Sequence, residues 1–72
     1  MQNTIGERIK AARERRVYGR TELAKLAGLT YISILRIETG QRQPRPATIR
    51  KIAGALGVDP ITLVNEKDAA QS

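Results

Sequence analysis

Residues 31–39, YISILRIET, combine an arginine, several hydroxyl groups and apolar side chains at helical spacing. At about 100° per residue in a helix, Ile34 and Ile37 share one side, which indicates a buried face. Ile32 and Arg36 fall on the opposite side, where a helix that meets only water would favour Lys or Glu. An arginine can form two hydrogen bonds with guanine, and an isoleucine can contact the methyl group of thymine. The segment therefore predicts a helix that meets DNA through Ile32 and Arg36, while Tyr31 and Ser33 can donate to base edges or to phosphates.

The same outer face has a second interpretation. Ile32 and Leu35 could pack against a neighbouring helix or a protein partner, because an exposed apolar pair rimmed by polar residues is typical of an interface. The two interpretations differ in what Arg36 does. A base reader loses DNA binding when Arg36 is replaced, whereas an interaction module loses its partner.

The elements that must position these side chains are short helices. Apolar spacing and helix punctuation predict five of them, over about residues 4–16, 20–27, 31–39, 46–56 and 60–65, and no strand. Gly28 closes the second helix and Thr30 caps the third, so these helices and their tight turn form a helix-turn-helix unit. We expect one all-α domain over residues 1–66 and a polar, frayed tail over residues 67–72.

The composition excludes several classes of function. The chain has 72 residues and contains neither cysteine nor histidine, which rules out disulfides, thiolate metal sites and histidine acid–base catalysis. With no phosphate-binding glycine loop and no carboxylate pair at a catalytic spacing, we expect no enzymatic activity, no cofactor and no metal. No apolar run reaches the roughly 18 residues of a membrane span, and no signal peptide is evident. We therefore expect a cytoplasmic protein.

Positive charge is concentrated in one part of the chain. The formal net charge is +6, and residues 8–51 hold twelve lysines and arginines against three glutamates, whereas residues 52–72 carry a small negative excess. A concentrated positive surface suits a polyanion, although a solvated face that keeps a small domain soluble has the same composition. We favour double-stranded DNA as the partner, because the two tyrosines do not form the stacking platform of single-stranded RNA readers.

Four stretches resemble the Cro/C1-type, or XRE, family of bacterial and phage helix-turn-helix repressors: IGERIKAAR, ELAKLAGLT, ILRIETG and PATIRKIAGALGV. Each is weak alone, but their order and spacing are specific, and the resemblance extends from residue 5 to about residue 64. The resemblance implies a five-helix, lambda-repressor-like domain that binds a palindromic operator as a homodimer and regulates transcription, most often as a repressor. Small domains of this family also serve as antitoxins or adaptors, so a protein partner is the alternative.

The resemblance implies that the helix over residues 31–39 reads bases through Tyr31, Ile32, Ser33 and Arg36. It also assigns roles outside this helix. Contacts with DNA phosphates fall on Arg20, Thr30, Gly40, Arg42 and Arg45. Glu38 commonly pairs with an arginine of the first helix, here Arg13, and this ion pair would fasten the reading helix to the scaffold without reading a base. The candidate dimer contacts lie on the fifth helix, at Ile61, Leu63 and Val64.

Two departures from the family pattern fall within residues 17–20. The second helix starts with Gly19 and Arg20, where the family has a capping Ser, Thr or Asn followed by Gln. An arginine at a helix N-terminus opposes the macrodipole, so we expect Arg20 to gain a charge-assisted bond with a phosphate. Val17 stands where a glycine is expected after the first helix, which predicts an irregular turn over residues 17–19.

Overall fold

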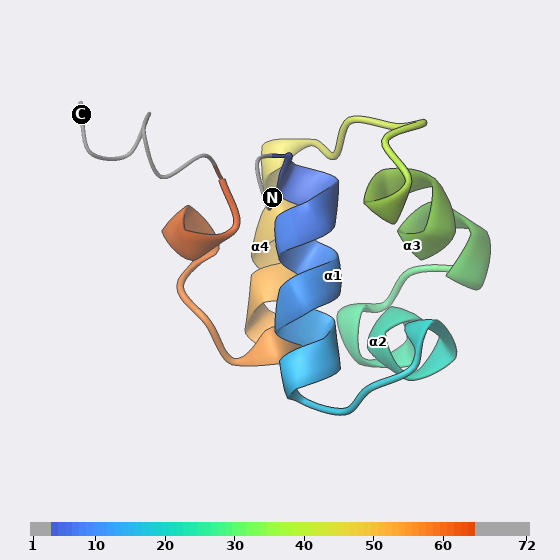
Figure 1. Ribbon diagram of the computed structural model, residues 1–72, viewed down its shortest axis with the longest axis vertical. Coiled ribbons are helices and arrows are strands. Elements are labelled where there is room, and N and C mark those ends of the chain that lie inside the picture. The colour runs from blue at the N-terminus through green and yellow to red at the C-terminus, as the bar shows by residue number, and fades with distance from the viewer. Residues whose placement is uncertain (1–3, 65–72) are drawn as a thin grey trace.

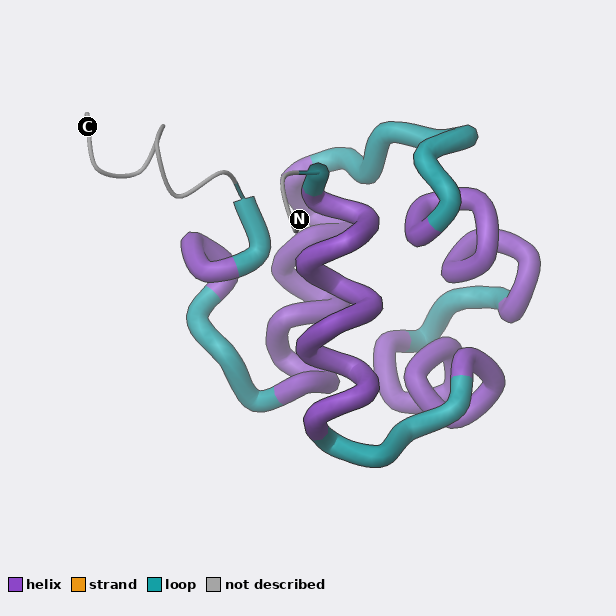
Figure 2. Tube along the Cα trace, in the orientation of Figure 1, coloured by secondary structure: helices purple, strands orange, loops and turns teal. Residues whose placement is uncertain are grey.

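Four α-helices and one 3-10 turn make up residues 4–64, the part of the chain that the computed structural model describes. The elements are α1 (Ile5–Arg15), α2 (Arg20–Ala27), α3 (Tyr31–Glu38), α4 (Pro46–Leu56) and η1 (Pro60–Thr62). Figure 1 shows α1 and α4 side by side, with α2 and α3 on one side of this pair and η1 on the other. No strand interrupts the helices within these residues (Figure 2).

The start of α1 is defined by a capping box. The Thr4 hydroxyl accepts a hydrogen bond from the Glu7 N–H at 3.1 Å, and the Glu7 carboxylate accepts one from the Thr4 N–H at 3.3 Å. The sequence signal is a threonine followed three residues later by a glutamate, immediately before apolar residues with helical spacing. These reciprocal bonds satisfy backbone donors that the first helical turn leaves free.

One hydrophobic core joins all four helices and the segment after η1. Its largest fully buried side chains are Ile9, Leu23, Ile34, Ile37, Ile52, Leu56 and Leu63. Gly6 brings the start of α1 into contact with the end of α3, since a Cβ there would collide with the Ile37 and Glu38 carbonyl oxygens. The position of α3 on the scaffold therefore depends on a residue without a side chain at the crossing point.

The predicted first four helices are confirmed, but the fifth is wrong. Asp59 caps the segment, with its Oδ1 accepting from the Ile61 N–H at 3.1 Å, yet only a 3-10 turn forms. Leu63 then enters the core and is 1% exposed, so it has no surface to offer a dimer partner. The predicted end of this helix at residue 65 and the predicted tail over 67–72 lie outside the described residues.

The connection from α1 to α2 is irregular, as its departure from the family pattern predicts. Val17 adopts the left-handed region at φ 60° while 88% of its surface is exposed. This conformation is strained for a β-branched residue, because its Cβ substituents crowd the backbone. Gly19 precedes α2 in an extended conformation and offers no side-chain cap.

Candidate nucleic-acid interface

The turn between α2 and α3 sets the direction of α3. Gly28 ends α2 in the left-handed region at φ 72°, and its N–H donates to the Lys25 carbonyl at 3.2 Å. Thr30 begins α3, because its hydroxyl accepts a hydrogen bond from the Ser33 N–H at 3.1 Å. The predicted helix-turn-helix is therefore present, with α3 packed beside α2 at the edge of the molecule (Figure 1).

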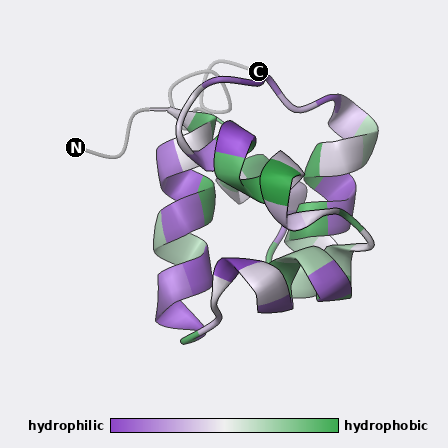
Figure 3. Cartoon of the chain, turned by 90° about the vertical axis from the view of Figure 1, so that its right-hand side faces the viewer, coloured by the Kyte–Doolittle hydropathy of each residue, from purple (hydrophilic) through white to green (hydrophobic). Residues whose placement is uncertain are grey.

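One side of α3 is buried in the core and the other is exposed to solvent. Ile34 and Ile37 are 0% and 2% exposed, as their spacing predicts. Tyr31 and Ile32 keep 44% and 49% of their surface exposed, and Arg36 is exposed as well. Figure 3 looks onto the side formed by α2 and α3 and shows strongly hydrophobic residues along α3. The structure thus leaves the predicted base-reading side of α3 uncovered.

Glu38, at the end of α3, is the centre of a buried ion-pair network. Its side chain is 1% exposed, and Arg13 of α1 binds it through two hydrogen bonds, Nε to Oε2 at 2.7 Å and Nη2 to Oε1 at 3.0 Å. Arg13 Nη1 donates to the Tyr18 carbonyl at 2.8 Å. The predicted ion pair is confirmed, and its bidentate geometry fixes the end of α3 to α1.

Arg20 is a third member of this network, which the sequence pattern did not predict. Its Nε donates to Glu38 Oε1 at 2.9 Å, and its side chain is 29% exposed. Glu38 raises the pKa of Arg20, and the Tyr31 hydroxyl acts in the same direction. The carboxylate therefore offsets the unfavourable position of a cation at the start of α2. Since a guanidinium has five N–H groups, the bond with Glu38 leaves others that can meet a phosphate.

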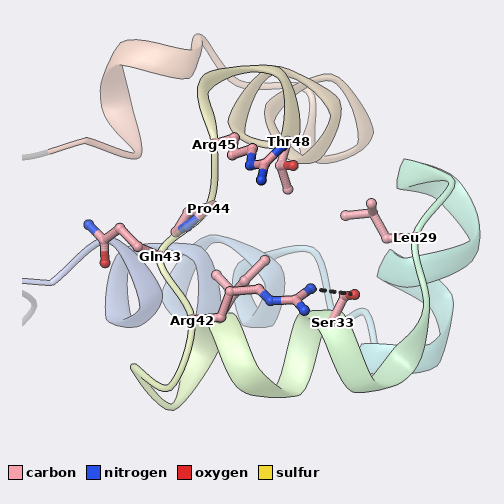
Figure 4. A pocket seen from close by; sticks show the side chains of 8 residues that line it. Leu29, Ser33, Arg42, Gln43, Pro44, Arg45 and Thr48 are labelled. Carbon is pink, nitrogen blue, oxygen red and sulfur yellow. Dashed lines mark hydrogen bonds between the residues drawn. The ribbon is translucent and has the colours of Figure 1, made fainter.

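A polar cleft of about 470 Å³ lies between α3 and the start of α4. Its lining residues, drawn in Figure 4, are Leu29, Ser33, Ile37, Arg42, Gln43, Pro44, Arg45 and Thr48. The Arg42 guanidinium lies over α3 and donates to Ser33 Oγ at 3.3 Å, whereas Arg45 projects from the start of α4. Two cations and no carboxylate line this cleft, so its charge favours an anion.

The backbone at the start of the loop after α3 is already hydrogen-bonded. The Gly40 N–H donates to the Ile37 carbonyl at 3.2 Å, and the N–H groups of Gln41 and Arg42 donate to the Arg36 carbonyl at 2.8 and 3.1 Å. Gly40 adopts φ 83°, a conformation that glycine reaches without strain. Gly40 thus shapes the start of the loop, and its N–H, like those of Gln41 and Arg42, already has a backbone acceptor.

Figure 1 shows η1 on the side of the α1 and α4 pair that faces away from α3. An apolar groove lies between η1 and α4. It is lined by Pro46, Ile49, Arg50, Pro60, Ile61 and Val64. Ile61 is 50% exposed and Val64 is half-buried, so these two of the three predicted dimer residues reach the surface.

Residues 4–64 hold no cluster of three or more His, Cys, Asp or Glu side chains that could bind a metal ion. Nor does any helix in this range combine the length and apolar composition needed to cross a membrane.

Comparison with known proteins identifies similar DNA-binding domains. The chain matches a helix-turn-helix family model over residues 9–63. It is 43% identical over 56 residues to the HTH-type transcriptional repressor RghR of Bacillus subtilis, covering 76% of this chain and 42% of that protein. It is 36% identical over 64 residues to the immunity repressor protein of Bacillus phage phi105, covering 89% of this chain and 44% of that protein. The chain therefore spans less than half the length of these two relatives.

The fold has a counterpart that was solved with bound DNA. The crystal structure of the P22 c2 repressor protein in complex with a synthetic operator is similar to this chain with a TM-score of 0.80. The two sequences are 26% identical, and the match covers 86% of this chain and 94% of that one.

Proposed function

Because this chain belongs to the Cro/C1-type helix-turn-helix family, we propose that it is a sequence-specific DNA-binding transcriptional regulator. The observation that carries this proposal is the free side of α3, where Tyr31, Ile32 and Arg36 are exposed. Arg36 would bond with guanine O6 and N7, and Ile32 would contact a thymine methyl group. Both relatives are repressors and the similar solved domain is bound to an operator, which supports repression by occupancy of a DNA site.

Cationic side chains on both flanks of α3 would hold the DNA backbone. Arg20 lies at the start of α2, while Arg42 and Arg45 line the cleft beside α4. Such contacts supply affinity and register but no sequence choice. Thr30 donates its hydroxyl proton to Ser33, so its backbone N–H at the start of α3 is the group left for a phosphate.

We infer that two copies bind one two-fold operator. A single α3 reads only a few base pairs, and half-sites one helical turn apart, roughly 34 Å, double the sequence that is read. The candidate contact between copies is the apolar groove at Ile61 and Val64, because its lining is mostly apolar and open to solvent. Leu63 takes no part, since it belongs to the core.

Selection from a random duplex library with the purified protein tests this proposal. The expected result is an enriched palindrome whose half-sites are about one helical turn apart. Recovery of unrelated duplexes, held only by weak and salt-sensitive binding, would contradict it.

A protein-interaction module is the second candidate, in the manner of an antitoxin or adaptor. Its support is the exposed Ile32 beside the half-buried Leu35 on α3, since apolar residues at a surface are typical of protein interfaces. An Arg36→Ala variant that keeps its DNA affinity but loses a protein partner would favour this candidate. In either case we expect no enzymatic activity, and DNA binding would place the protein at the nucleoid.

A further inference from the structure

The Ser33 hydroxyl is held by donors from two segments of the chain. Thr30, the cap residue of α3, donates to Ser33 Oγ at 3.0 Å and accepts the Ser33 N–H at 3.1 Å. Arg42, in the loop beyond α3, donates from Nη1 to the same oxygen at 3.3 Å (Figure 4). These bonds join the loop after α3 to the first turn of the helix.

The chemistry of these groups restricts what Ser33 can offer to a ligand. A serine hydroxyl has one proton and two lone pairs, and a guanidinium has no acceptor at all. The bond from Arg42 must therefore use a lone pair of Ser33, and the bond from Thr30 uses the other. Only the Ser33 proton is then left for an outside partner, so the hydroxyl acts as a donor.

We propose that Arg42 determines base specificity by holding Ser33 in this donor state. This inference rests on the proposed DNA-binding function, in which the first turn of α3 meets base edges in the major groove. A hydroxyl that can only donate selects the acceptors of guanine, adenine and thymine, and it rejects cytosine, whose major-groove edge presents an amino donor. Without Arg42, one lone pair of Ser33 becomes free, and the hydroxyl can turn to accept from that amino group.

Arg45 provides a matched control for the charge of Arg42. It lines the same cleft and carries the same charge, but within the described residues it makes no hydrogen bond with Ser33. Replacing Arg45 by alanine thus removes one cation from the cleft while leaving the Ser33 hydroxyl restrained. The side chains of Arg42 and Arg45 are both exposed, so neither alanine variant creates a cavity in the core.

The experiment measures Kd on the selected operator and on its base variants at one position. That position is the one whose preference changes in Ser33→Ala. Wild type, Ser33→Ala, Arg42→Ala, Arg45→Ala and the double variant of Ser33 and Arg42 are compared on all four bases there. Circular dichroism and thermal melting of each variant establish that the domain is folded.

We expect wild type to bind the cytosine variant roughly threefold to tenfold more weakly, as one hydrogen bond contributes. Arg42→Ala should reduce that penalty to less than twofold, and the double variant should match Ser33→Ala in its base preference. Arg45→Ala should weaken binding to all four base variants by the same factor, so the cytosine penalty should stay as in wild type. A full cytosine penalty in Arg42→Ala, or a Ser33→Ala variant with unchanged base preferences, would overturn the inference while leaving the proposed function intact. A wild-type protein that selects no operator would instead contradict the proposed function.

Discussion

Arg20, the first residue of α2, is joined to Glu38, the last residue of α3, by a hydrogen bond of 2.9 Å between Nε and Oε1. Glu38 also holds Arg13 of α1, so one buried carboxylate connects three helices. The α3 helix is thereby fixed at its C-terminal end, opposite the turn that places its N-terminal end. A rigid α3 reduces the ordering cost of binding, which favours recognition by a small domain.

Replacing Glu38 by glutamine should lower the free energy of unfolding by about 3 kcal/mol, because it leaves the buried Arg13 guanidinium without a counter-charge. Urea denaturation followed by circular dichroism measures this difference. Glu22→Gln is the control, since Glu22 is an exposed glutamate of α2 and its replacement should change the stability by less than about 0.5 kcal/mol. Equal stability of the two variants would contradict the structural role of the network.

Gly6→Ala should destabilise the domain by about 1–3 kcal/mol, because the new Cβ collides with the Ile37 and Glu38 carbonyl oxygens. Gly54→Ala is the matched control in α4, where a Cβ meets open space. Alanine favours a helix by about 1 kcal/mol over glycine, so this control should be more stable than wild type. The melting temperature should therefore fall in Gly6→Ala and rise in Gly54→Ala. Shifts of the same sign in the two variants would count against the close approach of α1 and α3.

Val17→Gly should stabilise the domain by about 1 kcal/mol, since glycine relieves the left-handed strain at a position with little packing to lose. Gly28→Ala is the opposite change at the turn before α3, where φ is also positive. It should destabilise the domain, because alanine is strained in that conformation. Chemical denaturation of both variants provides the comparison. A less stable Val17→Gly protein would mean that the Val17 side chain contributes contacts that exceed its backbone strain.

Ile61→Asp should weaken dimerisation and DNA affinity without unfolding the domain, because Ile61 is half-exposed in the apolar groove. Leu26→Asp adds the same charge at a similarly exposed apolar residue of α2, away from that groove. Sedimentation equilibrium with and without operator DNA measures the oligomeric state of both variants. An Ile61→Asp protein with the oligomeric state of wild type would place the dimer contact elsewhere.

The salt dependence of binding should report the arginines that flank α3. If Arg20, Arg42 and Arg45 each neutralise a phosphate in both protomers, the logarithm of the association constant should fall with the logarithm of the salt concentration. The expected slope is about −5. Arg45→Ala should reduce that slope by about 2, since one contact is lost from each protomer. Fluorescence anisotropy titrations at several salt concentrations give both values, and a slope near zero would argue against DNA as the ligand.

Local signals in the sequence were sufficient to predict the helix-turn-helix. Ile34 and Ile37 share a helical face, and Gly28 and Thr30 mark the turn, so each boundary depends on residues within one or two turns. The predicted pair of Arg13 and Glu38 came from the family resemblance rather than from spacing. The structure contains this ion pair, so the resemblance predicted a tertiary contact that spacing alone did not.

Contacts that depend on tertiary placement could not be predicted in the same way. Arg20 meets Glu38 across 18 residues, and no local pattern says which cation will lie beside a buried carboxylate. Asp59 and Pro60, which precede Leu63, fit the start of a helix as well as a single turn. The inward direction of Leu63 depends on packing against the core, which no local pattern shows. The bond from Arg42 to Ser33 likewise depends on the path of the loop.

The most direct test of the central claim compares wild type with Arg36→Ala on the selected operator and on each base variant of its half-site. If α3 reads bases, wild type should prefer guanine at one position by about 1–3 kcal/mol, and Arg36→Ala should lose that preference while keeping the others. An Arg36→Ala protein whose base preferences match those of wild type at every position would contradict the assignment of α3 as the base-reading helix.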